Sequence, residues 1–224
     1  MPYIDNLLSD LAVFPVMGEK LDDSNSILMD FSPTNLELPS VEISNTETFN
    51  RYVFGLLHKA GKRFGHGGYF EHRVIYSRST VFATAEEDFR DIHMGVDIWA
   101  EAGTPVFAPL DAVVHSFQDN AGFGNYGPTI ILQHEVGGTV FFSLYGHLAK
   151  TDLIHLSPGQ VISKGEEFCH LGPYPENGDW PPHLHFQIMW DLMGNVGDFP
   201  GVCSHREIDK YRQICPDPVI LIGH

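Results

Sequence analysis

The spacing of apolar residues changes along the chain and predicts one helix ahead of a series of strands. Between residues 46 and 61 the apolar positions recur at helical spacing, Thr46 or Thr48 can serve as N-cap, and Gly61 can end the helix. The apolar positions are Phe49, Val53, Leu56 and Leu57. We therefore expect a helix near 46–61. The first 50 residues otherwise mix short apolar stretches with Pro, Ser, Asn and acidic residues.

From Val74 onward, short segments rich in Val, Ile, Phe and Tyr are separated by Gly, Pro, Asn and Asp, which is typical of strands and turns. The candidate strands are HRVIY, HMGVDIWA, TPVFAP, DAVVHSFQ, PTIILQHE, TVFFSLYGHL, QVIS, EEFCHLG and HLHFQIMW. Many short strands in close succession favour an antiparallel β-sheet or sandwich. The expected fold class is mainly β, with one N-terminal helix and irregular N- and C-terminal extensions.

These patterns divide the chain into three expected regions. Residues 1–71 are predicted to form an N-terminal extension that wraps the main domain, residues 72–190 the β core, and residues 191–224 a C-terminal extension packed on that core. The sequence contains no GxGxxG, GKS or GxSxG element, so nucleotide-binding and α/β-hydrolase functions have no support.

The segment HMGVD places two polar residues where strand geometry brings them together. Side chains of a strand alternate between its faces, so His93 and Asp97 are expected on the same face, on either side of Gly95. A glycine between them leaves room for an ion or a substrate backbone to come close.

Two further segments carry histidines at informative positions. In HLHF, the same alternation places His183 and His185 on one face, while Leu184 and Phe186 turn into the core. In YGHL, His147 stands at the end of a strand that is otherwise apolar.

The chemistry of zinc explains why such residues would be gathered in one place. A catalytic zinc ion takes three protein ligands, commonly imidazoles with one carboxylate, and keeps a further position for water. Histidines that are not ligands can take a proton from that water or give one to a leaving amine. The pattern predicts a hydrolase site with one zinc ion. The residues alone do not say which of His147, His183 and His185 binds the metal.

Charge and composition narrow the range of partners. The formal net charge of −16 at pH 7 disfavours nucleic acid and anionic membranes, and a neutral or cationic substrate fits better. No run approaches the ~20 apolar residues of a membrane span. The N-terminus lacks the layout of a secretory signal, which predicts a cytoplasmic protein, or an exported one if the chain was trimmed. The oligomeric state is not indicated.

Taken together, these segments resemble the lysostaphin-type zinc metalloendopeptidases, which are β-sheet hydrolases that cut peptide cross-bridges in bacterial peptidoglycan. The resemblance spans roughly residues 72–190 and is carried, in family order, by IHMGVDIWAEAGTPVFAPLDAVV, GNYGPTIILQHE, LYGHLA, LSPGQVISKGEEFCHLG and PPHLHFQI. It implies one zinc ion bound by His93, Asp97 and His185. It also implies that His147 and His183 are the catalytic pair, and that the substrate is a peptide or peptidoglycan-like.

The approach to the HLH motif departs from the family pattern. A short Gly-, Ser- and Thr-rich segment is replaced by LGPYPENGDWPPHLHF, which carries Tyr174, Trp180 and four prolines. We expect this loop, residues 172–182, to form one wall of the cleft, and substrate choice is therefore left open. Residues 191–224 resemble the tail of related domains fused to aminotransferases in some large proteins.

Two alternatives stand beside the peptidase. One is an intracellular hydrolase of a small amide or peptide in an aminotransferase-linked pathway. The other is a non-catalytic peptide-binding module, which is disfavoured because degenerate family members lose site residues that are all present here. A further hypothesis concerns regulation: in some relatives an N-terminal asparagine occupies the fourth zinc position. The extension offers Asn25, Asn35 and Asn45, but their residue type and surroundings favour ordinary turn asparagines over a metal ligand.

Overall fold

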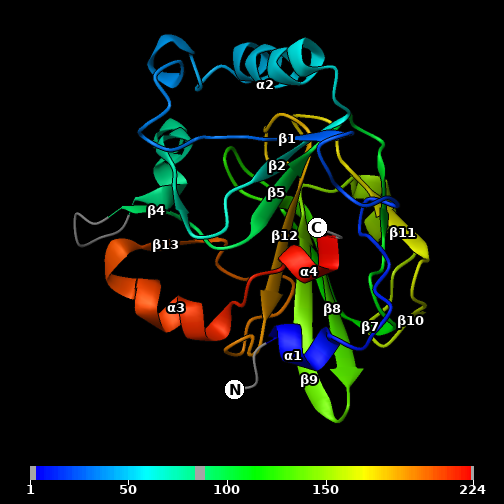
Figure 1. Ribbon diagram of the computed structural model, residues 1–224. Coiled ribbons are helices and arrows are strands. Elements are labelled where there is room, and N and C mark those ends of the chain that lie inside the picture. Colours follow the sequence, from blue (N-terminus) through cyan, green and yellow to red (C-terminus); the bar gives the residue numbers. More distant parts are fainter. Residues whose placement is uncertain (1–3, 84–88, 223–224) are drawn as a thin grey trace.

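A computed structural model describes residues 4–83 and 89–222, and the fold is mainly β, as the sequence predicts (Figure 1). The largest sheet has eight strands in the order β1-β2-β5-β12-β9-β8-β7-β10. Their bounds, in the same order, are Ser26–Leu28, Phe64–Gly67, Val96–Trp99, His183–Met189, Thr139–Gly146, Gly127–Val136, Ala112–Asn120 and Val161–Ile162. All neighbouring pairs are antiparallel except β1 and β2, which are parallel.

Two small sheets accompany the large one. The first pairs β11 (Glu167–His170) with β6 (Pro105–Phe107), and the second orders β13 (Val202–Ser204), β4 (Arg90–His93) and β3 (Glu71–His72). The α-helices are α1 (Ile4–Leu8), α2 (Thr46–Ala60), α3 (Ile208–Ile214) and α4 (Val219–Ile222). Short 3-10 helices are η1 (Leu38–Ser40), η2 (Val74–Arg78), η3 (Thr80–Phe82), η4 (Lys150–Leu153) and η5 (His205–Glu207). Among the described residues, no helix has both the length and the apolarity to cross a membrane.

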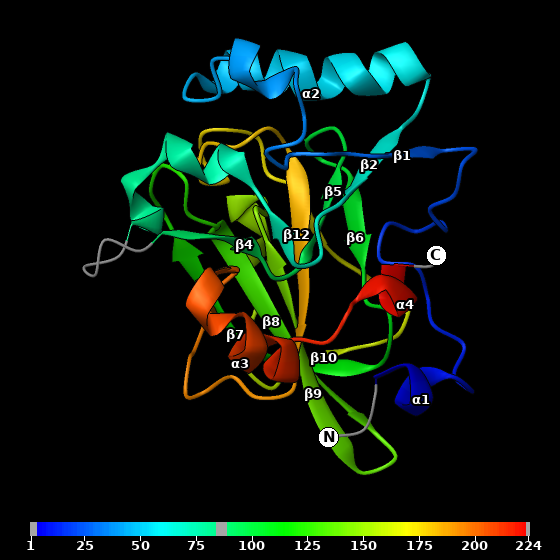
Figure 2. The same ribbon diagram turned by 60° about the vertical axis from the view of Figure 1, so that its left-hand side comes forward.

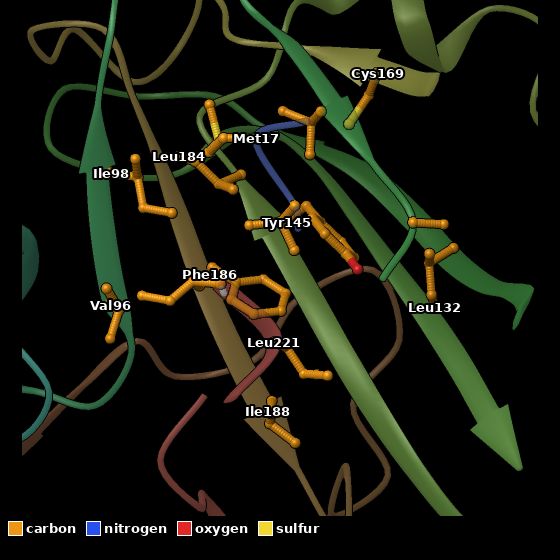
Figure 3. Close-up of a cluster of buried hydrophobic side chains, with 14 of the residues drawn as sticks. Met17, Val96, Ile98, Leu132, Tyr145, Cys169, Leu184, Phe186, Ile188 and Leu221 are labelled. Carbon is orange, nitrogen blue, oxygen red and sulfur yellow. The ribbon is translucent and has the colours of Figure 1, made fainter. Parts of the chain in front are cut away.

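The two faces of the large sheet have different roles. One face carries the main hydrophobic core, in which Leu184, Phe186 and Ile188 of β12 pack with Tyr145 of β9, and residues of α1 and α4 join them (Figure 3). The alternation predicted for HLHF is therefore confirmed for its apolar residues. On the other face lie β4 and α3 (Figure 2), together with β13, which pairs with β4. Apolar side chains of these elements form a separate buried cluster. The histidines of β12 point to this second face.

The helix in the segment 46–61 is present, although its cap differs from the expected one. The side chain of Asn45, rather than Thr46 or Thr48, accepts the hydrogen bond from the Thr48 amide at the N-terminus of α2, and Gly61 ends the helix in the left-handed conformation with φ of 65°. Phe49 and Val53 are buried. Figures 1 and 2 place α2 across the end of the sheet that carries β1 and β2.

The predicted strand HRVIY is wrong beyond its first residue. The strand β3 ends at His72, and Val74–Arg78 form the 3-10 helix η2. Ile75 and Tyr76 are both buried, in the cluster around α2, although they are consecutive. A strand would send these consecutive side chains to opposite faces, whereas the turn of helix η2 allows both to pack in the same cluster.

The predicted strand HMGVDIWA is two strands that belong to different sheets. β4 ends at His93 and β5 begins at Val96, so the two residues between them lead the chain from the three-stranded sheet to the eight-stranded one. A Cβ atom at Gly95 would lie 2.6 Å from the Phe186 carbonyl oxygen and 2.9 Å from Cε1 of His185. The space beside Gly95 is thus filled by β12, and the expected room for an ion or a substrate backbone is absent there.

The terminal segments contain more regular structure than the expected irregular extensions. Residues before 72 add β1 and β2 to the large sheet, and β2 pairs directly with β5. Residues after 190 contribute β13 to the three-stranded sheet and also form α3 and α4. Because β4 pairs with both β3 and β13, the strand that ends at His93 is held by both terminal segments.

Candidate metal centre

Strand pairing gathers the five predicted site residues on one face of the large sheet. His185 on β12 lies opposite Asp97 on β5 and opposite Gly146 at the end of β9, directly before His147. His93 reaches the same place from the end of β4. All five side chains are buried, with exposed fractions of 6% or less for His93, Asp97, His147, His183 and His185.

Three of these residues form a compact set of metal-binding atoms. Oδ1 of Asp97 lies 3.1 Å from Nε2 of His93 and 3.1 Å from Nδ1 of His185. The two imidazole nitrogens are 2.8 Å apart. All three atoms lie within 4.8 Å of one another, so one ion between them can contact all of them. His93, Asp97 and His185 can therefore hold a metal ion.

The other nitrogen of each imidazole faces an acceptor, which fixes the tautomer. Nδ1–H of His93 donates to the Gly68 carbonyl over 2.9 Å, and Nε2–H of His185 donates to Oε1 of Gln187 over 3.0 Å. The free lone pairs of the two rings then face each other at 2.8 Å. Burial and the nearby Arg73 lower the pKa of His93 to about 3, so His93 is neutral near neutral pH. A cation between the two nitrogens would bind both lone pairs.

Asp97 is held from its other side by a buried arginine. The guanidinium of Arg73 donates to Oδ2 of Asp97, to Oε2 of Glu71 over 2.6 Å, and to the Gly67 carbonyl over 3.1 Å. Burial opposes ionisation of Asp97, but His93 and Arg73 nevertheless hold its pKa well below the ordinary value. Asp97 is therefore a carboxylate, with Oδ1 available to a metal.

Gly68 is required where the Arg73 and His93 side chains converge. A Cβ atom at this position would lie 1.9 Å from Nη2 of Arg73 and 2.8 Å from Nδ1 of His93, and the backbone φ of 104° is in the region that favours glycine. Only a residue without a side chain lets its carbonyl approach His93 closely.

His147 and His183 form a pair beside the metal-binding atoms. Their rings are 4.2 Å apart, and Nε2 of His183 lies 3.8 Å from Oδ2 of Asp97. Nδ1–H of His147 donates to the Asn177 carbonyl over 2.8 Å, and Nδ1–H of His183 donates to the Pro181 carbonyl over 2.7 Å. Each ring thus keeps an unprotonated Nε2. Burial lowers the pKa of both side chains, well below the ordinary value for His147, so both are neutral bases.

The loop 172–182 does more than form a wall of the site. Its carbonyl groups at Asn177 and Pro181 orient the two histidines, as described above. Trp180 of the same loop lines the cavity, as expected, and its indole N–H donates to the Asn125 carbonyl over 3.2 Å. Tyr174, in contrast, is 38% exposed and does not line the cavity.

A cavity of about 280 Å³ opens onto these groups. Asp97, His147, His183 and His185 contribute polar atoms to its lining. Most of the remaining lining is aromatic or apolar. Part of it comes from three helices that precede β4: Phe49 of α2, Ile75 and Tyr76 of η2, and Val81 and Phe82 of η3. The hypothesis that Asn25, Asn35 or Asn45 occupies the metal site is wrong for this structure, since none of them lines the cavity and each bonds elsewhere.

Sequence reasoning missed the residues that orient the site. Gln187 carried a usable signal, because it follows His185 by two positions on the same strand and therefore shares its face. Arg73 and Gly68 gave no such signal, since their partners lie far away along the chain. Cys169, Cys203 and Cys215 are buried free thiols.

Comparisons with known proteins match the part of the chain that carries this site. Residues 91–196 match the model of peptidase family M23. Peptidoglycan DD-endopeptidase ShyA of Vibrio cholerae is 32% identical over 98 residues, which are 43% of this chain and 20% of that protein. The L-Ala--D-Glu endopeptidase of Bacillus subtilis is 31% identical over 146 residues, 59% of this chain and 42% of that protein. The chain thus spans less than half the length of each of these relatives.

Solved structures are similar over about half of the chain. The catalytic domain of lysostaphin from Staphylococcus simulans is 25% identical, with a TM-score of 0.35, over 55% of this chain and 80% of that one. A zinc-containing peptidase from Vibrio cholerae is 22% identical, with a TM-score of 0.34, over 51% of this chain and 29% of that one. Residues 91–196 are therefore similar in sequence to peptidase family M23 and to these two endopeptidases.

Proposed function

We propose that the protein is a zinc-dependent metallopeptidase that hydrolyses a peptide bond, with the metal held by His93, Asp97 and His185. One observation carries the proposal: two imidazole lone pairs and a carboxylate oxygen converge within 4.8 Å, while hydrogen bonds to Gly68 and Gln187 prevent either ring from turning its N–H inward. Two imidazoles and one carboxylate are a ligand set typical of catalytic zinc.

A zinc ion bound there supplies Lewis-acid chemistry, which polarises a carbonyl group and makes water more acidic. The neutral side chains of His147 and His183 can carry out the proton transfers. Their Nε2 atoms are unprotonated, because both Nδ1–H groups are committed to backbone carbonyls. Either Nε2 can accept the proton of an attacking water and later deliver it to the leaving amine.

The arrangement of the two rings favours a shared task. Their centroids are 4.2 Å apart, so a positive charge on one ring disfavours a second on the other. The pair therefore holds one proton at a time, which suits a reaction that takes one proton from water and returns it to the leaving group. Asp97, 3.8 Å from His183, stabilises that proton once it is bound.

The peptidoglycan class of substrate is supported by the relatives, since both are named as endopeptidases, one of them of peptidoglycan. A second candidate is a smaller amide or peptide. It is favoured by the side chains from α2, η2 and η3 that line the cavity, because these elements lie outside the region that matches the family. All five polar side chains of the site are present, which disfavours a non-catalytic module.

The experiment that tests the proposal measures metal and activity together. The purified protein should contain stoichiometric zinc by elemental analysis, and His93→Ala should lose it. The protein should then cleave either purified peptidoglycan or short synthetic peptides, and Asp97→Ala should cleave neither. Cleavage of small peptides alone would favour the second candidate. Absence of zinc from the wild-type protein, with metal content and stability unchanged in His93→Ala, would overturn the enzyme proposal.

A further inference from the structure

We propose a second divalent-metal site, formed by His72, Asp91 and His205 at the surface of the three-stranded sheet. These residues come from three elements: His72 ends β3, Asp91 lies in β4, and His205 begins η5. One ligand atom of each lies within 4.8 Å of the other two. None of them belongs to the cavity or to the metal centre described above.

The distances within this cluster match those around a tetrahedral ion. Nε2 of His72 is 3.2 Å from Oδ2 of Asp91, and Nε2 of His205 is 3.5 Å from Oδ1 of the same carboxylate. Two ligands that each lie about 2.1 Å from a tetrahedral zinc ion are about 3.4 Å apart. The two rings pack edge to face with centroids 5.1 Å apart, so both Nε2 atoms reach the carboxylate without a clash.

A second observation concerns Oδ1, the oxygen of Asp91 that does not face His72. Oδ1 of Asp91 is inaccessible to solvent, yet it accepts no hydrogen bond from any residue that the structure describes. A buried carboxylate oxygen without a hydrogen bond is costly, and a bound cation removes that cost. The approach of His205 to this atom, at 3.5 Å, is too long for a hydrogen bond and suits two ligands of one ion.

The ligand set selects the class of metal. Two imidazoles and one carboxylate favour Zn²⁺ and related transition metals over Mg²⁺ and Ca²⁺, which prefer oxygen ligands. The imidazoles are partly open to solvent, with side-chain exposures of 43% for His72 and 58% for His205. Water can therefore complete the coordination, and the ion can exchange with solution.

An ion in this position would join three parts of the chain. It would connect the end of β3 and the start of η5 to β4, which two residues later presents His93 to the first centre. Binding only to the folded chain stabilises it by mass action. This second site does not depend on the proposed peptidase activity, because its three residues lie outside the cavity and bind an ion without any hydrolysis.

The test is a titration of the metal-free full chain with Co²⁺ and with Zn²⁺, followed by elemental analysis and by thermal unfolding. We expect two ions per chain in the wild type and one in the His72→Ala/His205→Ala variant. The conservative change Asp91→Asn should weaken the second binding event by at least about 10-fold. The matched control is His155→Ala, an exposed histidine outside both clusters, which should still bind two ions.

Outcomes of the titration separate the two sites. His93→Ala should retain one ion, and zinc should still raise its unfolding temperature. The second site is wrong if the wild type binds a single ion, or if the double variant binds as many ions as the wild type. If the double variant fails to fold by circular dichroism, the single variants His72→Ala and His205→Ala are titrated, and each must show the loss.

Discussion

Arg73 donates a hydrogen bond from its guanidinium to Oδ2 of Asp97, and both side chains are buried, with exposed fractions of 1% and 3%. The same guanidinium bonds Glu71 and lies over the rings of Phe31 and Trp99. Asp97 thus has one oxygen committed to a permanent cation and one, Oδ1, directed at the two imidazoles. Oδ2 therefore has a structural role, and Oδ1 is the atom that can bind a metal.

Removal of Arg73 should leave a buried carboxylate without its partner. We expect Arg73→Ala to destabilise the metal-free protein by about 3 to 5 kcal/mol, because breaking a buried ion pair strands the remaining charge. Urea unfolding measures this loss. The matched control is Arg63→Ala, whose ion pair with Glu19 is exposed, and it should cost about 1 kcal/mol or less. Equal losses for the two variants would show that Arg73 does not hold Asp97.

Gln187 should control metal affinity through the tautomer of His185. Its Oε1 accepts the Nε2–H of His185, which directs the lone pair of Nδ1 towards Asp97. We expect Gln187→Leu, which keeps the volume and removes the acceptor, to weaken zinc binding by about 10- to 100-fold. Competition with a chelator of known affinity measures the effect. Gln213→Leu on the exposed side of α3 is the control, and an unchanged affinity in Gln187→Leu would contradict the proposed orienting role.

The sequence predicts this site well where neighbours along one strand decide it. His183 and His185 share a face of β12, and Leu184 packs in the core on the other, because alternation within a strand is fixed by backbone geometry. The same reasoning failed for His93 and Asp97. They meet because β4 and β5 turn towards each other around Gly95, a tertiary arrangement that alternation within one strand does not describe.

Contacts between distant segments set the part that the sequence does not reveal. Arg73 reaches Asp97 only because β3 pairs with β4, and Gly68 reaches His93 only because the chain between β2 and β3 passes over it. The strand predicted at HRVIY failed for the same reason, since burial beside α2 decides whether Ile75 and Tyr76 form a strand or a turn of helix. Local propensity is weaker than such packing.

Stability should fall in mild acid because a buried histidine outside the site cannot take a proton. Burial lowers the pKa of His134 to about 4, and its ring is bonded to Ser143 and to the Asp111 carbonyl. Above pH ~6.5 the ring is neutral in both the folded and unfolded states. Between pH ~6.5 and ~4 only the unfolded chain binds the proton, so falling pH favours unfolding, by about 3 kcal/mol in total.

The variant His134→Asn removes this titrating group. Unfolding of the metal-free protein in urea, measured from pH 7 to pH 4, should show a smaller loss of stability in this variant than in the wild type. The pH dependence is the readout, because the substitution also changes packing. His58→Asn at an exposed position of α2 should follow the wild type. A slope in His134→Asn as steep as that of the wild type would assign the acid sensitivity to other groups.

Asn177 joins the loop 172–182 to the pair of histidines. Its carbonyl accepts from His147, while its side chain donates to the carbonyls of Gly172 and Trp180 and accepts from the Trp180 amide. These bonds close the loop upon itself, and the side chain is fully buried. The orientation of His147 therefore depends on a residue that does not line the cavity.

Replacement of Asn177 should separate metal binding from turnover. We expect Asn177→Ala to keep its zinc, because His93, Asp97 and His185 are held by other residues. Turnover should fall by about 10²-fold, because the loop loses the side-chain bonds that hold the residue 177 carbonyl against His147. Elemental analysis and the rate of peptide cleavage at saturating substrate measure the two effects. The control is Asn35→Ala, whose side chain bonds Asp30 and Tyr52 away from the cavity, and it should keep both. Loss of zinc together with activity would instead show that the loop helps to hold the metal. Unchanged turnover would show either that His147 takes no part in the reaction or that Asn177 does not orient it.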